Sequence, residues 1–99
     1  GDRDFPTICA LLHDEVSEAF GAWRDGHEVT EVWLDPQVSV EDGSGHLLPK
    51  PEGVPIELGD ILLRVRACCY DKDIDIEAAL EMKMRYNRWR PFKHGGKRV

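Results

Sequence analysis

The sequence predicts an all-α fold, an antiparallel helical bundle that is completed by oligomerisation. Three segments repeat apolar residues at helical spacing, and the chain of 99 residues has the length of a single domain. Its 41% apolar and 32% charged residues are typical of a soluble globular protein. Because three helices leave much apolar surface exposed in so small a chain, we expect subunits to associate.

The first helix is predicted over residues 5–23, where Ile8, Leu12 and Ala19 share one apolar face. The second, over residues 54–70, is apolar on nearly every side, which indicates an interior helix. The third is predicted over residues 76–89, with Asp75 as its N-cap.

Residues 27–53 form an inserted loop within a single domain spanning 1–99. Residues 29–34 are rich in β-branched and aromatic side chains and are predicted to form a strand. Asp35-Pro36 then turns the chain, and residues 38–40 form the second strand. The sequence therefore predicts a short β-hairpin at about 29–40.

Charge is unevenly distributed along the chain, whose net charge is −6. Residues 82–99 contain seven basic and no acidic side chains, whereas the rest contains six basic and nineteen acidic ones. An acidic body with a basic end suits a metal-bound polyanion, although a solvated helix end has the same pattern. The odd count of three cysteines and the absence of a signal-peptide or membrane-spanning pattern favour a cytoplasmic protein without membrane association.

Acidic residues lie beside the apolar stripes of the first two helices. Glu15 and Glu18 are three residues apart on the first helix, and Glu57 and Asp60 are three apart on the second. Carboxylates in such places need a counter-charge, and Mg²⁺ prefers oxygen ligands. We therefore predict that these four residues bind Mg²⁺, with Mn²⁺ as a substitute. The alternatives are solvated acidic faces and, for Asp60, a helix salt bridge to Arg64.

On the third helix, Lys83, Asn87 and Arg90 continue a stripe that begins with Ile76 and Leu80. These polar groups suit phosphate oxygens that the metal does not neutralise. The alternative is that the helix emerges into solvent at its end.

This combination resembles the MazG-like, all-α nucleotide pyrophosphohydrolase superfamily. The resemblance rests on the Glu-x-x-Glu pair from Glu15, the Glu-x-x-Asp pair from Glu57, the 73–80 segment, and the order of Lys83, Asn87 and Arg90-Pro91. It implies a homodimer or homotetramer that hydrolyses a nucleoside triphosphate to the monophosphate and pyrophosphate. It also implies Mg²⁺ ligation by Glu15, Glu18, Glu57 and Asp60, and phosphate binding by Lys83, Asn87 and Arg90.

The acidic residues suggest how such a reaction proceeds. Bound metal neutralises phosphate charge and acidifies water, and Glu15 or Glu18 is expected to take the water's proton as the catalytic base. The resembled family usually has a helix, with base-holding aromatic residues, before the first acidic pair, and we expect this domain to lack it. Trp23 and Trp33 are candidates for base stacking, although core or loop anchoring is commoner for such residues.

Two other functions remain open from the sequence. A phosphoribosyl-ATP pyrophosphohydrolase shares the acidic pairs on the same fold. A non-catalytic helical module would bind nucleic acid through the basic C-terminal tail. Since the body of the chain is acidic, we do not expect nucleic acid to be the partner.

Overall fold

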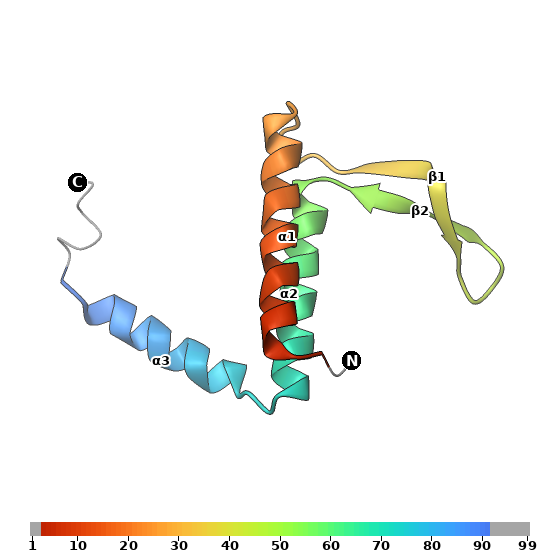
Figure 1. The fold of residues 1–99 in the computed structure, drawn as a ribbon. Helices are drawn as coiled ribbons and strands as arrows, with labels where there is room; N and C mark the ends of the chain where they lie inside the picture. The colour runs from red at the N-terminus through yellow and green to blue at the C-terminus, as the bar shows by residue number, and fades with distance from the viewer. Residues whose placement is uncertain (1–2, 92–99) are drawn as a thin grey trace.

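The computed structural model describes residues 3–91 (Figure 1). The elements follow in the order α1 (Phe5–Arg24), β1 (Trp33–Glu41), β2 (Leu47–Glu52), α2 (Val54–Asp71) and α3 (Ile76–Trp89). Helices α1 and α2 lie side by side and antiparallel, and the two strands extend from one end of this pair. The three predicted helices are confirmed, within a residue at each end.

The all-α prediction is wrong, because an antiparallel two-stranded sheet interrupts the helices. Its physical origin is the valine- and proline-rich composition of the inserted loop. Proline lacks the backbone N–H that a helix interior requires, and both strands of a two-stranded sheet are edges, where proline is tolerated. Pro36 in β1 and Pro49 and Pro51 in β2 are thus compatible with strands but not with a helix.

The hairpin also lies further along the chain than the predicted 29–40, because Asp35-Pro36 does not reverse the chain. The pairing register shifts between Asp35 and Ser39, so this dipeptide occupies an irregularity within β1. The Asp35 carboxylate accepts a hydrogen bond from the Gln37 backbone N–H at 3.0 Å, and the Ser39 hydroxyl donates to the Pro36 carbonyl at 2.8 Å. These bonds stabilise an irregularity within β1, and the chain reverses only at the following turn.

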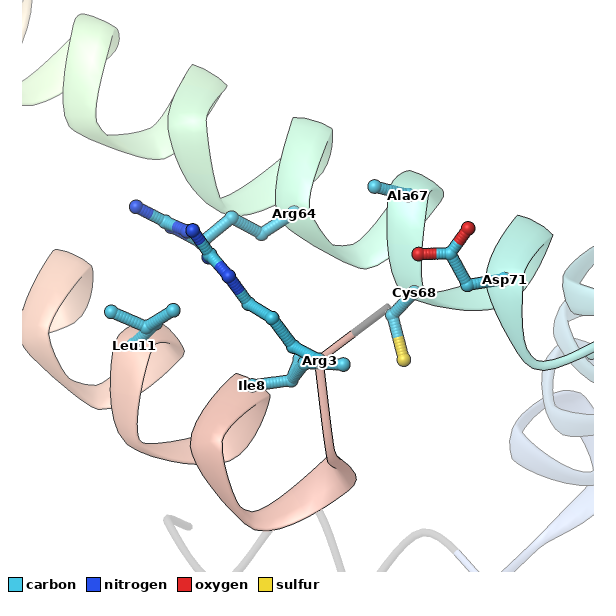
Figure 2. A pocket seen from close by; sticks show the side chains of 7 residues that line it. All are labelled: Arg3, Ile8, Leu11, Arg64, Ala67, Cys68 and Asp71. Carbon is cyan, nitrogen blue, oxygen red and sulfur yellow. The ribbon is translucent and has the colours of Figure 1, made fainter. Parts of the chain in front are cut away.

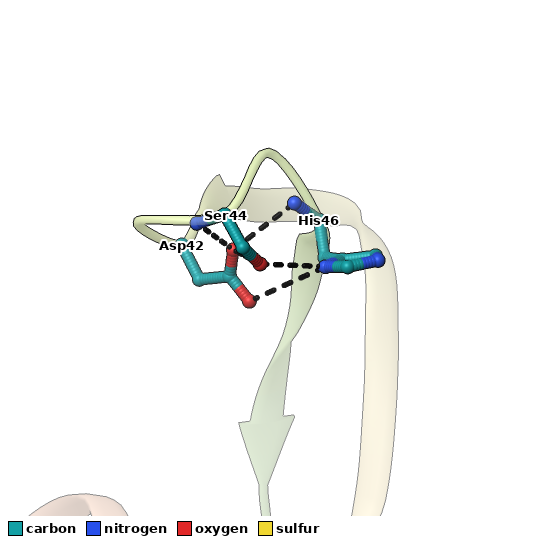
Figure 3. A network of polar contacts seen from close by, with 3 residues as sticks. All are labelled: Asp42, Ser44 and His46. Carbon is teal, nitrogen blue, oxygen red and sulfur yellow. Dashed lines mark hydrogen bonds and ion pairs between the residues drawn. The ribbon is translucent and has the colours of Figure 1, made fainter.

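The chain reverses between Asp42 and His46 instead (Figure 3). Asp42 Oδ1 accepts hydrogen bonds from the Ser44 backbone N–H and hydroxyl, both at 2.8 Å, and from the His46 backbone N–H at 3.0 Å. These bonds, the one from the Ser44 hydroxyl foremost, hold the pKa of Asp42 below its usual range. The Asp42 side chain therefore holds the turn together with the backbone hydrogen bond that the Asp42 N–H donates to the His46 carbonyl at 2.8 Å.

The core lies between α1 and α2 and is small. Its buried apolar residues are Ile8, Ala19, Val54, Cys68 and Cys69. The predicted interior position of the second helix is not found within one copy of the chain, since Leu58, Leu62 and Leu63 are 51–66% exposed. Two helices in contact can cover only one face of each other, which leaves the remaining faces in solvent.

Helix α3 begins as predicted, with the Asp75 carboxylate accepting a hydrogen bond from the Ala78 backbone N–H at 3.0 Å. It then projects away from the α1–α2 pair (Figure 1) and buries none of its residues in the part of the chain that the structure describes. Of the basic segment 82–99, the part from residue 92 onward lies outside the described residues. None of the helices within residues 3–91 has the length and apolarity that crossing a lipid bilayer requires.

Candidate metal centre

Three of the four predicted metal ligands come together where α1 and α2 pack. Glu15 and Glu18 are one turn apart on α1, and Glu57 lies in the first turn of α2. One carboxylate oxygen from each of these residues lies within 4.8 Å of the other two. The antiparallel contact of the helices thus joins pairs that are about forty residues apart in the sequence.

Glu15 is the innermost member of this three-glutamate cluster, with 7% of its surface exposed. Its Oε2 accepts a hydrogen bond from Arg64 Nε at 2.9 Å. Its Oε1 and the Oε1 of Glu57 are buried and have no hydrogen-bond partner among residues 3–91. Because buried carboxylate oxygens nearly always have a partner, these two need a cation beside them or a proton shared between the carboxyl groups.

The three-glutamate cluster also has more negative than positive charge. The pKa of Glu57 is raised to about 7, first by burial, next by hydrogen bonding of its protonated form with the Glu15 and Glu18 carboxyl groups, and then by repulsion from their charges. Arg64 provides one positive charge to three carboxylates. A divalent cation with oxygen ligands would supply the missing charge, so the donor set fits Mg²⁺ or Mn²⁺.

Asp60 is not part of this cluster. It is half-buried on α2, one turn beyond Glu57. The helix salt bridge considered for Asp60 is also not formed, since Arg64 pairs with Glu15 across the helix contact.

The predicted phosphate-binding residues lie on α3, away from the cluster (Figure 1). Lys83 and Asn87 are exposed, and Lys83 Nζ lies 5.2 Å from the centroid of the Tyr86 ring. Arg90 is half-buried at the end of the same helix. Within one copy of the chain, therefore, the structure does not bring these three residues to the glutamates.

Sequence reasoning missed the role of Arg64. The side chain crosses from α2 to Glu15 and also lines a cavity of about 230 Å³ between the two helices. Figure 2 shows Arg64 and Arg3 extending into this space beside Ile8, Leu11 and Cys68. The local signal, a spacing of four residues from Asp60, pointed to the wrong carboxylate because only the fold brings Glu15 near.

A search of family models, curated proteins and solved structures finds no match to this chain.

Proposed function

We propose that this protein is a Mg²⁺-dependent nucleotide pyrophosphohydrolase that converts a (deoxy)nucleoside triphosphate to the monophosphate and pyrophosphate. The observation that carries the proposal is the pair of buried carboxylate oxygens in the three-glutamate cluster that have no hydrogen-bond partner within residues 3–91. Acidic pairs at the same spacing on two helices, followed by a lysine and an asparagine, are the pattern on which the resemblance to MazG-like enzymes rests.

Glu15, Glu18 and Glu57 would hold the metal. When bound there, Mg²⁺ would neutralise phosphate charge and lower the pKa of a water molecule. Arg64 fixes the orientation of Glu15 and keeps its Oε2 occupied. Glu18 is the exposed member of the cluster, so it is accessible to solvent and is our choice for the base that takes the proton of the attacking water. Asp60 stays in the proposal as a fourth carboxylate.

We also propose that copies of the chain associate in the cytoplasm. On α3, Leu80, Met84 and Trp89 are 48–78% exposed, an apolar surface that pairing would cover. Association is one way for Lys83 and Asn87 of one copy to reach the glutamates of another. The molar mass in solution, measured by light scattering, tests this.

The test of function is a Mg²⁺-dependent assay over ordinary and modified (deoxy)nucleotides and phosphoribosyl-ATP, with separate detection of pyrophosphate and orthophosphate. We expect pyrophosphate release that EDTA abolishes. Glu15→Gln and Glu57→Gln should each lower kcat by about 100-fold or more, because each removes a metal ligand. Asp60→Asn, assayed in parallel, reports whether the fourth carboxylate takes part.

The matched control is Asp14→Asn, which removes an exposed acid beside Glu15 on the same helix and should leave the rate unchanged. Folded Glu15→Gln and Glu57→Gln variants with wild-type rates would show that the cluster is not the active site. Turnover of phosphoribosyl-ATP alone would assign the chain to that narrower activity.

A further inference from the structure

A cavity of about 400 Å³ opens beside the three-glutamate cluster and shares Glu18 and Glu57 with it. One of its walls is the end of α1, including Gly21, and another is the base of the hairpin, including Trp33 and Lys50. A molecule lying in this cavity would therefore touch both the carboxylates and the inserted segment. The cavity therefore lies between the glutamates and the β-hairpin.

An aromatic wall forms the hairpin side of the cavity. The rings of His27 and Trp33 are stacked, with centroids 4.0 Å apart and planes inclined by 23°. His27 Nδ1 lies 3.1 Å from Glu31 Oε1, which fixes the orientation of the imidazole. Gly53, with a φ of +127°, lets the backbone pass close to Glu31 and the Trp33 ring, where a Cβ would collide with the Glu31 carbonyl oxygen. The wall is therefore built into the junction between hairpin and α2.

Aromatic rings lining a cavity next to a proposed metal site are suited to nucleotides, because every base has a face that stacks on an aromatic side chain and a bound cation would offset the phosphate charge. The cavity also contains a cation, since Lys50 lines it and lies 3.6 Å from Glu52 at the nearest charged atoms. Lys50 is half-exposed, so its ammonium group can exchange Glu52 for sugar or phosphate oxygens.

We propose that this cavity binds the base and sugar of the nucleotide, with the base against the His27–Trp33 wall and the phosphates toward Glu18 and Glu57. The inference rests on the proposed function and adds to it the residues that select the substrate. Trp33 and His27 are specificity-determining residues in this assignment, while the glutamates are the catalytic residues.

The test is calorimetric binding to the 99-residue chain with Mg²⁺. Two kinds of probe are compared: α,β-methylene nucleoside triphosphates with each common base, which cannot be cleaved between the α- and β-phosphates, and inorganic tripolyphosphate, which has no base. Trp33→Leu removes the indole. Gly21→Leu places a side chain in the cavity from a position where an added Cβ meets no atom within 4 Å. Phe20→Leu is the matched control, because Phe20 is exposed on α1 and does not line the cavity.

We expect the wild-type chain to bind at least one nucleotide analogue about tenfold or more tightly than tripolyphosphate. Trp33→Leu and Gly21→Leu should remove this advantage without changing the affinity for tripolyphosphate, and Phe20→Leu should behave as the wild type. Equal binding of nucleotide and tripolyphosphate by the wild type would overturn the inference. Unchanged nucleotide binding by folded Gly21→Leu would also overturn it, even if Trp33→Leu failed to fold.

This experiment separates the two proposals because it requires no turnover. If the chain binds nucleotides through Trp33 but releases no pyrophosphate in the assay above, the proposed base-binding site stands and the proposed reaction is wrong. If the chain cleaves nucleotides while Trp33→Leu and Gly21→Leu bind them normally, the proposed reaction stands and the proposed base-binding site is wrong.

Discussion

Replacing Glu57 by glutamine should stabilise the metal-free protein at pH 8 and do so much less at pH 5. Glutamine preserves the shape of the side chain and cannot ionise. In the wild type without metal, an ionised Glu57 lies beside Glu15 and Glu18, whose charges it repels, and part of it is shielded from water. The substitution therefore removes an unfavourable charge wherever that charge exists.

The sign follows from proton binding. The pKa of Glu57 is about 7 in the folded chain against an ordinary value of 4.5, so between these pH values the folded state holds a proton that the unfolded state has lost. The free energy of unfolding of the wild type therefore falls as the pH rises from about 4.5 to about 7, and stays lowered above it. Glu57→Gln lacks this dependence, so its advantage should grow over the same interval.

The pKa difference corresponds to about 3 kcal/mol between the two protonation states. Because Glu57 is only half-buried, solvent screens part of this, and we expect roughly 1 kcal/mol at pH 8. For a domain of this size, that difference changes Tm by about 4–8 °C.

The assay is thermal and urea unfolding followed by circular dichroism in EDTA from pH 5 to pH 8, at fixed protein concentration. Asp14→Asn is the control for a lost surface charge. Addition of Mg²⁺ at pH 8 should make the wild type more stable than Glu57→Gln, since the wild type gains a bound cation that the variant binds poorly. A difference between Glu57→Gln and wild type that is the same at pH 5 and pH 8 would refute this account of the cluster.

Two further substitutions test the surroundings of the cluster. Arg64→Met leaves the buried Glu15 carboxylate without its hydrogen-bond donor and should lower the free energy of unfolding by about 2 kcal/mol, with partial recovery in Mg²⁺. Arg66→Met, at an exposed site on the same helix, is the control for thermal unfolding. Equal Tm values for the two variants would mean that the Arg64–Glu15 ion pair contributes nothing to stability. Gly53→Ala should lower the free energy of unfolding by about 2 kcal/mol or more, because the residue has a φ of +127° and a Cβ would collide with the Glu31 carbonyl oxygen. Gly43→Ala, where an added Cβ meets no atom within 4 Å, should change it by less than about 0.5 kcal/mol.

The helices and part of the site were predictable because their determinants are local. A 3.6-residue repeat of apolar side chains identifies a helix, and Asp75 caps α3 through a backbone N–H three residues away. The spacing of Glu15 and Glu18 beside an apolar stripe indicated inward-facing acids, and Glu15 is buried whereas Glu18 is exposed. In each case the residues that decide the structure are neighbours in the sequence.

The remaining features depend on contacts that sequence spacing does not reveal. Asp35-Pro36 has the composition of a turn, yet strand pairing on both sides holds it within β1, and the reversal occurs at Asp42. Arg64 is spaced to pair with Asp60, but the packing of α1 on α2 presents Glu15 instead. Local spacing competes with long-range packing at these positions, and packing determines the outcome.

The position of the hairpin relative to the glutamates links recognition to chemistry. The three carboxylates come from the two helices that form the core, whereas the aromatic wall comes from His27 before β1 and Trp33 at its start. Gly53 joins the two parts, because it ends the hairpin and lies four residues before Glu57. Under the proposals above, changes within the hairpin alter which nucleotide binds without moving the carboxylates, and changes at Gly53 disturb both. Base selection and metal binding should therefore be separable by substitution at Trp33 but not at Gly53.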